Sequence, residues 1–374
     1  MERYLFSQIK KDLIKKMVFV GGPRQVGKTT LARSIMPPKS YLNWDILEDR
    51  EKILKNELPP LKSFIFDEIH KYKSWRNYLK GLYDKNKPNI KILVTGSARL
   101  DFYRYSGDSL QGRYHYLRLH PITMDELNSY KKNTVLDLLN LGGFPEPFLG
   151  GNKIDAQRWS REYRMRILKD DISSIEVISD LGKAEQMLLR LPDLVASPLS
   201  INSLREDLQM DFKTAKRWLD IFERFYAIYR IQPFGSPKIK AVKKEQKHYH
   251  FDWTLVKNEG ARFENFVASH LIKWVHFLED TQGRDLQLCF YKDRDQREID
   301  FVITEDSKPL CFIECKLNEK KISPTLFFIR KKFPDIPCYQ LTEKDVGDFQ
   351  NQEGLRVAPV WVGLEEIKIL LNKN

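Results

Sequence analysis

Two short segments near the N-terminus carry the residue types that handle a nucleotide. Gly22-Pro23-Arg24-Gln25-Val26-Gly27-Lys28-Thr29 matches the pattern G-x4-G-K-[ST], and Thr30 continues into a predicted helix, Thr30 to Met36. Glycines at these positions let successive backbone N–H groups and the helix N-terminus face an anion. We therefore expect this loop to bind ATP, with Lys28 neutralising the β- and γ-phosphates and the Thr29 hydroxyl binding Mg²⁺.

The second segment is an apolar strand that ends in two carboxylates. Phe64-Ile65-Phe66 is followed directly by Asp67 and Glu68. In a P-loop ATPase such a pair divides the work, so we expect Asp67 to hold Mg²⁺ and Glu68 to orient or deprotonate the attacking water. The alternative is a solvated strand end with no catalytic role.

Two further residues are candidates for the same reaction. Ser97 ends the next apolar strand, which should lie between the strands that carry the phosphate loop and the carboxylate pair. Ser97, or alternatively Thr95 in the same strand, would contact the attacking water or the γ-phosphate; we favour Ser97, which could instead only cap a helix. Arg113 would supply positive charge to a neighbouring subunit's site, or would form a surface salt bridge.

The elements that must position these residues follow an α/β pattern. Short runs that are apolar on both faces alternate with helical stretches, which favours a parallel sheet covered by helices on both sides, the three-layer core of a P-loop NTPase. The predicted strands are 17–20, 41–44, 64–66, 92–94 and 114–119.

The middle of the chain has the layout of a winged helix. Two short helices between Leu199 and Phe225 precede strand-like runs at 226–234 and 248–253, with a basic stretch between these runs. Such a domain places its second helix in the major groove of DNA and its wing along the backbone. The alternative is a solvated face on a lid. The basic candidates for phosphate contacts are Lys213, Lys216, Arg217, Lys238, Lys240, Lys243 and Lys244.

A second group of acids lies near the C-terminus. Asp300 falls in one predicted strand (298–304) and Glu314 and Lys316 in the next (309–317). If the strands pair symmetrically about Ser307, Asp300 lies opposite Glu314, and Glu264 reaches them from the preceding helix. Paired carboxylates beside a lysine would bind a divalent metal next to a phosphodiester. The alternative is an ordinary hairpin with surface charges.

These motifs together resemble a prokaryotic family of AAA-type ATPases. The segments that carry the resemblance are the phosphate loop, Phe-Asp-Glu-Ile-His from Phe66, Thr95-Gly96-Ser97 and Gly142-Gly143-Phe144-Pro145-Glu146. The resemblance implies an ATP-binding core and a C-terminal domain of the restriction-endonuclease-like, PD-(D/E)xK type. Ile299 stands where that pattern has proline, a departure that concerns cleavage and not the fold. The family analogy also implies a homo-oligomer with the nucleotide site at a subunit boundary.

Composition bounds the remaining possibilities. The chain has 374 residues, and 63 Lys and Arg against 51 Asp and Glu give a net charge of +12. This excess favours a polyanionic partner, DNA first. No run is long and apolar enough to span a membrane, and the four cysteines contain no C-x-x-C pair. We expect a cytoplasmic protein with buried free thiols, no membrane partner and three domains, at 1–150, 151–255 and 256–374.

The functional hypothesis is an Mg²⁺-dependent ATPase that acts on or binds DNA and ends in a nuclease-like domain. The alternative is an ATP-operated conformational switch whose C-terminal domain binds protein or nucleic acid without cleavage. A chaperone-like remodeller is disfavoured, because the sequence has no recognisable pore loop.

Overall fold

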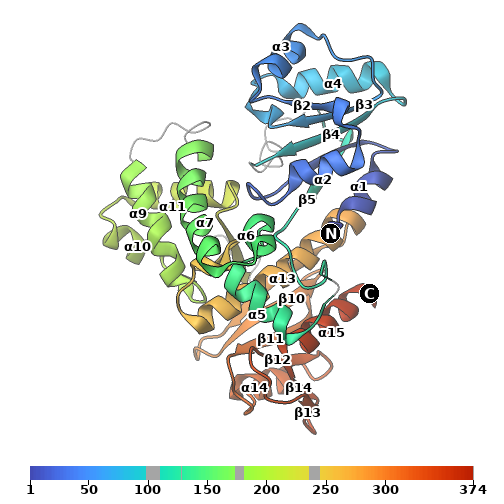
Figure 1. Ribbon diagram of the computed structural model, residues 1–374. Helices are drawn as coiled ribbons and strands as arrows, with labels where there is room; N and C mark the ends of the chain where they lie inside the picture. Colours follow the sequence, from blue (N-terminus) through green and yellow to red (C-terminus); the bar gives the residue numbers. More distant parts are fainter. Residues whose placement is uncertain (98–109, 128, 173–180, 236–244, 374) are drawn as a thin grey trace. The chain divides into compact units, whose positions relative to one another are not determined.

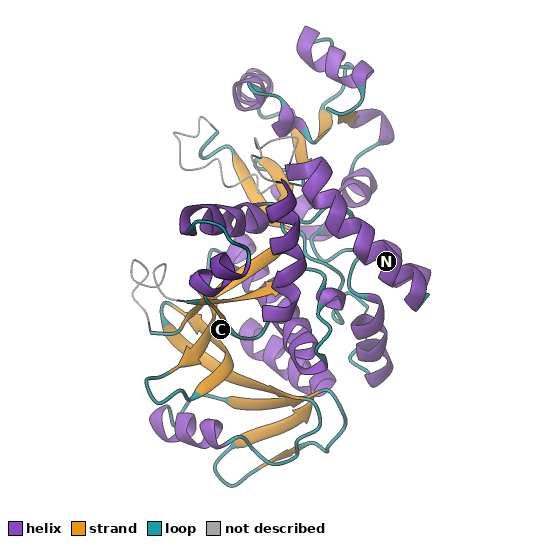
Figure 2. Ribbon diagram, turned by 90° about the vertical axis from the view of Figure 1, so that its left-hand side faces the viewer, coloured by secondary structure: helices purple, strands orange, loops and turns teal. Residues whose placement is uncertain are grey.

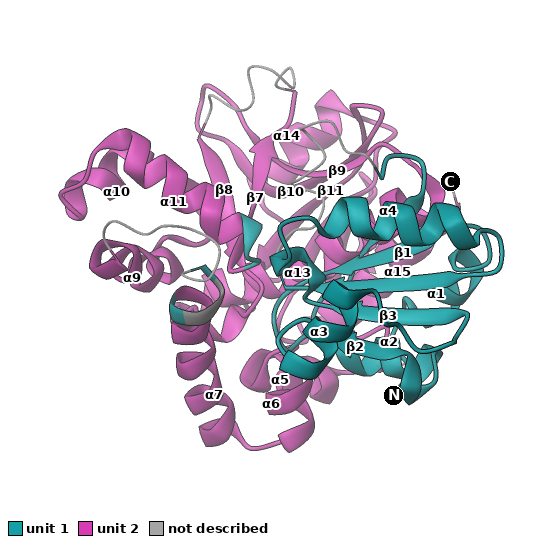
Figure 3. Ribbon diagram, turned by 90° about the horizontal axis from the view of Figure 1, so that it is seen from above, with its two compact units in different colours: residues 1–121, 169–177, 224–226 teal, residues 122–168, 178–223, 227–374 magenta. Residues whose placement is uncertain are grey.

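The computed structural model describes residues 1–374 except 98–109, 128, 173–180, 236–244 and 374 (Figure 1). It divides into two compact units, shown in teal and magenta in Figure 3. Unit 1 comprises Met1–Pro121, Lys169–Val177 and Arg224–Tyr226. Unit 2 comprises Ile122–Leu168, Ile178–Glu223 and Ala227–Asn374. In the described part of the chain, no helix combines the length and apolarity needed to cross a bilayer.

Unit 1 is a three-layer α/β structure around a parallel sheet of five strands in the order β2-β3-β4-β1-β5. All five predicted strands are present within one to two residues of the expected bounds, and β4 lies between β1 and β3 as predicted. Its elements are α1 (Phe6–Asp12), β1 (Met17–Gly21), α2 (Lys28–Ile35), η1 (Pro38–Ser40), β2 (Tyr41–Asn43), α3 (Leu47–Lys55), β3 (Ser63–Asp67), η2 (Ile69–Lys71), α4 (Trp75–Asn86), β4 (Lys91–Gly96) and β5 (Tyr114–Arg118).

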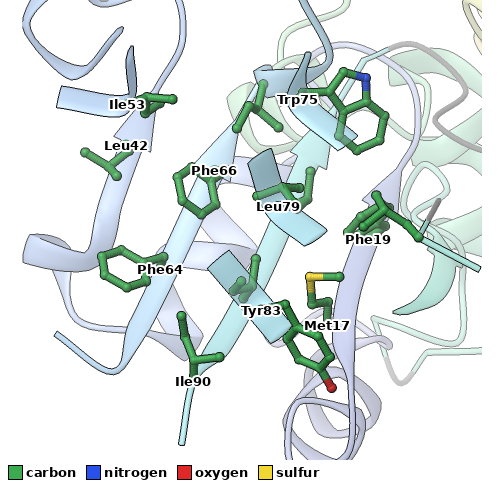
Figure 4. Close-up of a cluster of buried hydrophobic side chains, with 14 of the residues drawn as sticks. Met17, Phe19, Leu42, Ile53, Phe64, Phe66, Trp75, Leu79, Tyr83 and Ile90 are labelled. Atoms are coloured by element: carbon green, nitrogen blue, oxygen red, sulfur yellow. The ribbon is translucent and has the colours of Figure 1, made fainter. Parts of the chain in front are cut away.

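Alternation along the strands of unit 1 builds its main core. Side chains of one face of the sheet pack against α3 and α4, while α1 and α2 cover the other face (Figure 1). Burial on both faces explains why these strands are apolar runs rather than alternating ones. The core in Figure 4 includes Met17, Phe19, Leu42, Ile53, Phe64, Phe66, Trp75, Leu79, Tyr83 and Ile90.

Unit 2 contains a nine-stranded sheet in the order β13-β14-β12-β11-β10-β9-β7-β8-β6, with its strands drawn in orange in Figure 2. The bounds of its helices are α5 (Lys132–Leu141), α6 (Pro145–Gly150), α7 (Lys153–Arg166), α9 (Leu181–Arg190), η5 (Leu191–Leu194), α10 (Ile201–Asp207), α11 (Phe212–Arg224), η6 (Trp253–Leu255), α13 (Glu259–Gln282), α14 (Pro324–Lys332) and α15 (Val360–Lys373). Its strands are β6 (Pro198–Leu199), β7 (Ile228–Pro233), β8 (Gln246–His250), β9 (Leu286–Lys292), β10 (Glu298–Glu305), β11 (Lys308–Lys316), β12 (Cys338–Thr342), β13 (Phe349–Gln350) and β14 (Leu355–Pro359). The π-helical segment η4 (Ile167–Ile172) has residues in both units, and Arg224, the last residue of α11, belongs to unit 1.

One sheet thus runs through the segments that we assigned to a winged helix and to a nuclease-like domain. The predicted helices and hairpin are present as α10, α11, β7 and β8, and β7 also pairs in parallel with β9. Backbone pairing between β7 and β9 carries no signal in residue type, so the sequence did not reveal this continuity. The division of the chain at residues 150 and 255 stays a prediction.

The C-terminal hairpin follows the predicted register with one correction. Phe301 pairs with Ile313 and Val302 with Phe312, which is the register that places Asp300 level with Glu314. The predicted turn, 305–309, was too long: Glu305 pairs with Lys308, leaving a two-residue turn, and a register shift at Ile303/Thr304 compensates. Both turn residues have positive φ, the conformation that two-residue hairpin turns require.

The thiols are free, as expected. Cys289, Cys311 and Cys338 are buried, whereas Cys315 is only half-buried.

Candidate functional site

Asp67 lies at the end of β3 and is held by three hydroxyl groups. Its carboxylate accepts hydrogen bonds from Thr29 Oγ1 (2.7 Å), Thr95 Oγ1 (2.6 Å) and Tyr41 Oη (2.8 Å). These donors come from α2, β4 and β2, so the parallel strands and the phosphate loop converge on this carboxylate. A neutral donor fixes a carboxylate without cancelling its charge, which leaves Asp67 able to attract a cation.

The predicted phosphate loop, residues 22–27, connects β1 to α2, and Lys28, Thr29 and Thr30 form the first turn of α2. Glycine is required at two positions. Gly27 has φ 98°, and a Cβ at Gly22 would lie 2.3 Å from the Leu119 carbonyl oxygen. Lys28 is buried, and its Nζ donates to the carbonyl oxygens of Gly22 (2.8 Å) and Pro23 (2.7 Å). The ammonium is therefore folded into the loop that is predicted to enclose the phosphates.

Glu68 is fixed by the end of β4. Ser97 donates its backbone N–H to Glu68 Oε1 (3.1 Å) and its hydroxyl to Oε2 (3.2 Å). Glu68 adopts a left-handed backbone conformation, φ 55° and ψ 19°, which is uncommon for this residue type. Burial, together with the charge of Asp67, raises the pKa of Glu68 against the opposing charge of Lys28. A carboxyl with a raised pKa accepts a proton more readily, which suits a general base.

The sequence did not single out His70 as a site residue. Its side chain is fully buried, and its Nε2 lies 3.5 Å from Glu68 Oε2. Burial and the charges of Lys71 and Lys28 lower the pKa of His70 to about 3, so the imidazole is neutral. Within the described residues, neither ring nitrogen has a hydrogen-bond partner. The sequence feature that could have pointed to His70 is its position two residues after the carboxylate pair.

Arg113 forms a salt bridge within its own chain. Its Nε donates to Asp84 Oδ1 (2.8 Å) and its Nη2 to Asp84 Oδ2 (3.0 Å), and both side chains are partly exposed. This is the surface pair that we considered as the alternative role for Arg113.

The C-terminal acids Asp300 and Glu314 also lie close together, but each is held by a different donor. Lys316 Nζ lies 3.0 Å from Glu314 Oε1, as expected for two residues on one strand face. Asp300 Oδ2 accepts the backbone N–H of Cys315 at 2.8 Å. Burial, then the charge of Asp300, raises the pKa of Glu314 to about 7 and that of Glu264 to about 8.

A buried lysine that we did not predict stands among these acids. Lys247 Nζ lies 2.7 Å from Glu298 Oε1, 3.1 Å from Glu264 Oε1 and 3.6 Å from Asp300 Oδ1. Burial opposes its charge, but the three carboxylates outweigh burial and raise the pKa of Lys247. We assigned Lys247 no chemical role from the sequence, because it follows a run of other lysines and meets these acids only in the folded chain.

The predicted metal ligands Asp300, Glu314 and Glu264 do not fit a metal as they stand. Among the described residues, no three His, Cys, Asp or Glu side chains are grouped so that they could hold a metal ion. Asp67 and Thr29 fit Mg²⁺ better, because their oxygen atoms lie 2.7 Å apart and Mg²⁺ prefers such hard oxygen ligands.

The basic candidates for DNA contact are only partly described. Lys213, Lys216 and Arg217 are exposed on α11, whose opposite face is buried through Trp218 and Phe222. The other four, Lys238, Lys240, Lys243 and Lys244, lie outside the described residues.

Family models match three successive parts of the chain. Residues 14–128 match the model described as an AAA domain, which covers the phosphate loop and the carboxylate pair. The N-terminal domain is an AAA-type domain. Beyond this AAA domain, residues 132–259 match a domain of unknown function (DUF8612), and residues 259–360 match another (DUF4143).

Similar proteins extend over most of the chain. An uncharacterized protein of Methanocaldococcus jannaschii is 25% identical, and the match covers 90% of this chain and 80% of that protein. An uncharacterized protein of Mycobacterium tuberculosis is 24% identical and covers 78% of this chain and 71% of its own.

Two solved structures are similar at low identity. A signal transduction ATPase (STAND) with a tetratricopeptide repeat sensor from Pyrococcus horikoshii is 15% identical, with 74% of this chain and 47% of that chain covered and a TM-score of 0.24. A structure of Drosophila ORC bound to DNA is 13% identical; the match covers 65% of this chain and 89% of that chain, with a TM-score of 0.24. Scores of this size carry no functional argument.

Proposed function

We propose that this chain is an Mg²⁺-dependent ATPase that acts on or binds DNA. The observation that carries the proposal is the pair of acids at the end of β3: Asp67 is held by hydroxyl donors, one of them from the phosphate loop, and Glu68 is held by Ser97. When bound, Mg²⁺ would neutralise charge on the β- and γ-phosphates.

The residues of the AAA domain have distinct parts in this reaction. Lys28 exchanges the carbonyl oxygens of Gly22 and Pro23 for phosphate oxygens. Asp67 and Thr29 would hold the Mg²⁺. Glu68 accepts a proton from the attacking water, and Ser97 orients the Glu68 carboxylate.

The decisive test of ATP hydrolysis is Lys28→Ala. We expect phosphate release to fall to background, because Lys28 is the buried cation whose ammonium already lies inside the loop, on the carbonyl oxygens of Gly22 and Pro23. Lys52→Ala is the matched control, since Lys52 is exposed and pairs only at the surface of the same domain. Unchanged turnover in Lys28→Ala would exclude this site.

DNA as the partner is supported by the net charge of +12 and by the exposed Lys213, Lys216 and Arg217 on α11. We expect duplex, single-stranded or branched DNA to stimulate ATP hydrolysis, and the stimulation to fall steeply with salt. A Lys213→Ala/Lys216→Ala/Arg217→Ala triple variant should lose stimulation and keep the basal rate. ATPase activity indifferent to all three DNAs would contradict this part of the proposal.

The second candidate function is an ATP-operated switch whose restriction-endonuclease-like C-terminal domain binds protein or nucleic acid without cutting. The position of Lys247 among the acids of that domain favours it. A supercoiled-plasmid assay with Mg²⁺ or Mn²⁺, comparing wild type with Glu314→Ala, separates the candidates. Metal-dependent nicking that Glu314→Ala abolishes would favour the nuclease.

A further inference from the structure

The Lys247 ammonium contacts three acids of unit 2 that come from two other elements. It belongs to β8, whereas Glu264 belongs to α13 and both Glu298 and Asp300 belong to β10. The Lys247 side chain is fully buried, and its ammonium lies between 2.7 and 3.6 Å from a carboxylate oxygen of each. Buried charges are stable only when they are paired in this way. Lys247 is therefore a buried ion-pair partner of these three acids and not a surface lysine.

We propose that Lys247 is the resident cation of this cluster (Glu264, Glu298, Asp300 and Glu314), and that the cluster takes up no divalent metal while Lys247 is in place. The C-terminal domain would then bind without metal-dependent cleavage. This proposal rests on the second candidate function, in which the C-terminal domain binds protein or nucleic acid, and adds a reason why that domain would not cut.

Charge balance supports the assignment. The cluster has four carboxyl groups, and three ammonium groups lie within 4 Å of them: Lys247, Lys316 and Lys292, the last 3.5 Å from Glu298. Burial raises the pKa of Glu264 to about 8, so this carboxyl is largely protonated at neutral pH, and the three ammonium groups already match the negative charge of the other three acids. A divalent ion placed among the same oxygens would add two positive charges within a few ångströms of a buried ammonium. Like charges at such distances repel strongly in a medium of low dielectric constant.

Two of the carboxylate oxygen atoms also accept hydrogen bonds from other groups of the chain. Glu264 Oε1 accepts from Lys247 and from Tyr249 Oη (2.7 Å), and Asp300 Oδ2 accepts from the Cys315 N–H. Lys247 and Tyr249 lie on the same face of β8, so a single strand supplies both donors to Glu264. Within the described residues, Glu314 Oε2 is buried without a hydrogen-bond partner. Glu314 is therefore the residue that a metal would still need, and the one to replace in a test.

The experiment is a titration of the full chain with Mn²⁺ in the absence of nucleotide, followed by calorimetry and by the electron paramagnetic resonance of free Mn²⁺. We expect wild type and Glu314→Gln to give the same titration, with no saturable site that Glu314 controls. We expect Lys247→Met, which keeps side-chain volume and removes the charge, to gain one saturable site. That site should disappear in Lys247→Met/Glu314→Gln.

Lys273→Met is the matched control, because Lys273 is equally buried on α13 and pairs with Asp125 (3.0 Å) and Glu126 (2.7 Å). Its titration should match wild type, and a comparable gain there would overturn the assignment. Two other results would overturn the assignment. One is a saturable Mn²⁺ site in wild type that Glu314→Gln removes, and the other is a folded Lys247→Met variant that binds no Mn²⁺ at a saturable site.

The comparison of wild type with Glu314→Gln decides the question even if Lys247→Met does not fold. Phosphate release from ATP is measured separately on the same proteins. Failure of the ATPase proposal is therefore distinguishable from failure of this one.

Discussion

The acidic groups described in the two units come from different elements and are held by different donors. In unit 1, Asp67 and Glu68 end a parallel strand and accept hydrogen bonds from hydroxyl and backbone groups. In unit 2, Glu264 and Glu314 accept from the ammonium groups of Lys247 and Lys316. A hydroxyl orients a carboxylate and leaves its charge available, whereas an ammonium cancels it. The type of donor therefore decides whether a carboxylate is prepared for a metal ion or already neutralised.

Glu68→Gln should give the largest effect of the substitutions that test this comparison. We expect ATP turnover to fall by about 10²–10⁴-fold, because the general base is lost while the phosphate loop is intact. Binding of a fluorescent ATP analogue should be retained. Glu51→Gln, an exposed acid of the same domain, is the control. Turnover within twofold of wild type would remove Glu68 from the mechanism.

The pH dependence of stability should differ between wild type and Glu264→Gln. The pKa of Glu264 is raised from 4.5 to about 8, so between these values the folded chain binds more protons than the unfolded chain. Stability from this group is present below pH 4.5 and is lost as pH rises toward 8, with a slope of up to about 1.4 kcal/mol per pH unit.

Urea midpoints at pH 5, 6, 7 and 8 measure this loss. Glu264→Gln should flatten the decline, and Glu279→Gln, an exposed acid on the same helix, should leave it unchanged. Equal slopes in wild type and Glu264→Gln would show that the raised pKa of Glu264 does not control stability.

Thr95→Val probes the hydroxyl donors of unit 1. It keeps the side-chain shape and leaves Asp67 Oδ1 without its 2.6 Å hydrogen bond. We expect the free energy of unfolding to fall by about 1–3 kcal/mol, because a buried acceptor loses its partner. Tyr41→Phe removes one of the two hydroxyl donors to Asp67 Oδ2 and should cost less, since Thr29 still donates to that oxygen and Tyr41 is only partly buried. A larger loss in Tyr41→Phe would reverse this ranking.

Arg113→Ala should have the smallest effect on stability of these substitutions, because its pair with Asp84 is largely exposed. Turnover separates the two roles considered for Arg113. If Arg113→Ala lowers turnover at least tenfold while Asp84→Ala does not, Arg113 acts on a nucleotide, in its own or a neighbouring subunit. Equal, small effects of both would leave the surface salt bridge as its role.

The sequence by itself determined the elements of unit 1 and the residues that meet there. The central strands β1, β3 and β4 are apolar runs buried on both faces, and the phosphate loop, Asp67 and Ser97 all lie at strand ends. In a parallel sheet those ends lie at one edge, so local pattern was sufficient to bring them together.

Only the tertiary structure decided the chemistry of unit 2. The hairpin register was readable from the symmetry about Ser307, and the pairing of Glu314 with Lys316 from strand alternation. The joining of β7 to β9 and the approach of Lys247 to Glu264 were not readable. Both contacts join segments distant in sequence, and their energies depend on which faces are buried together. The charge state of a buried acid is set by such neighbours and not by its own residue type.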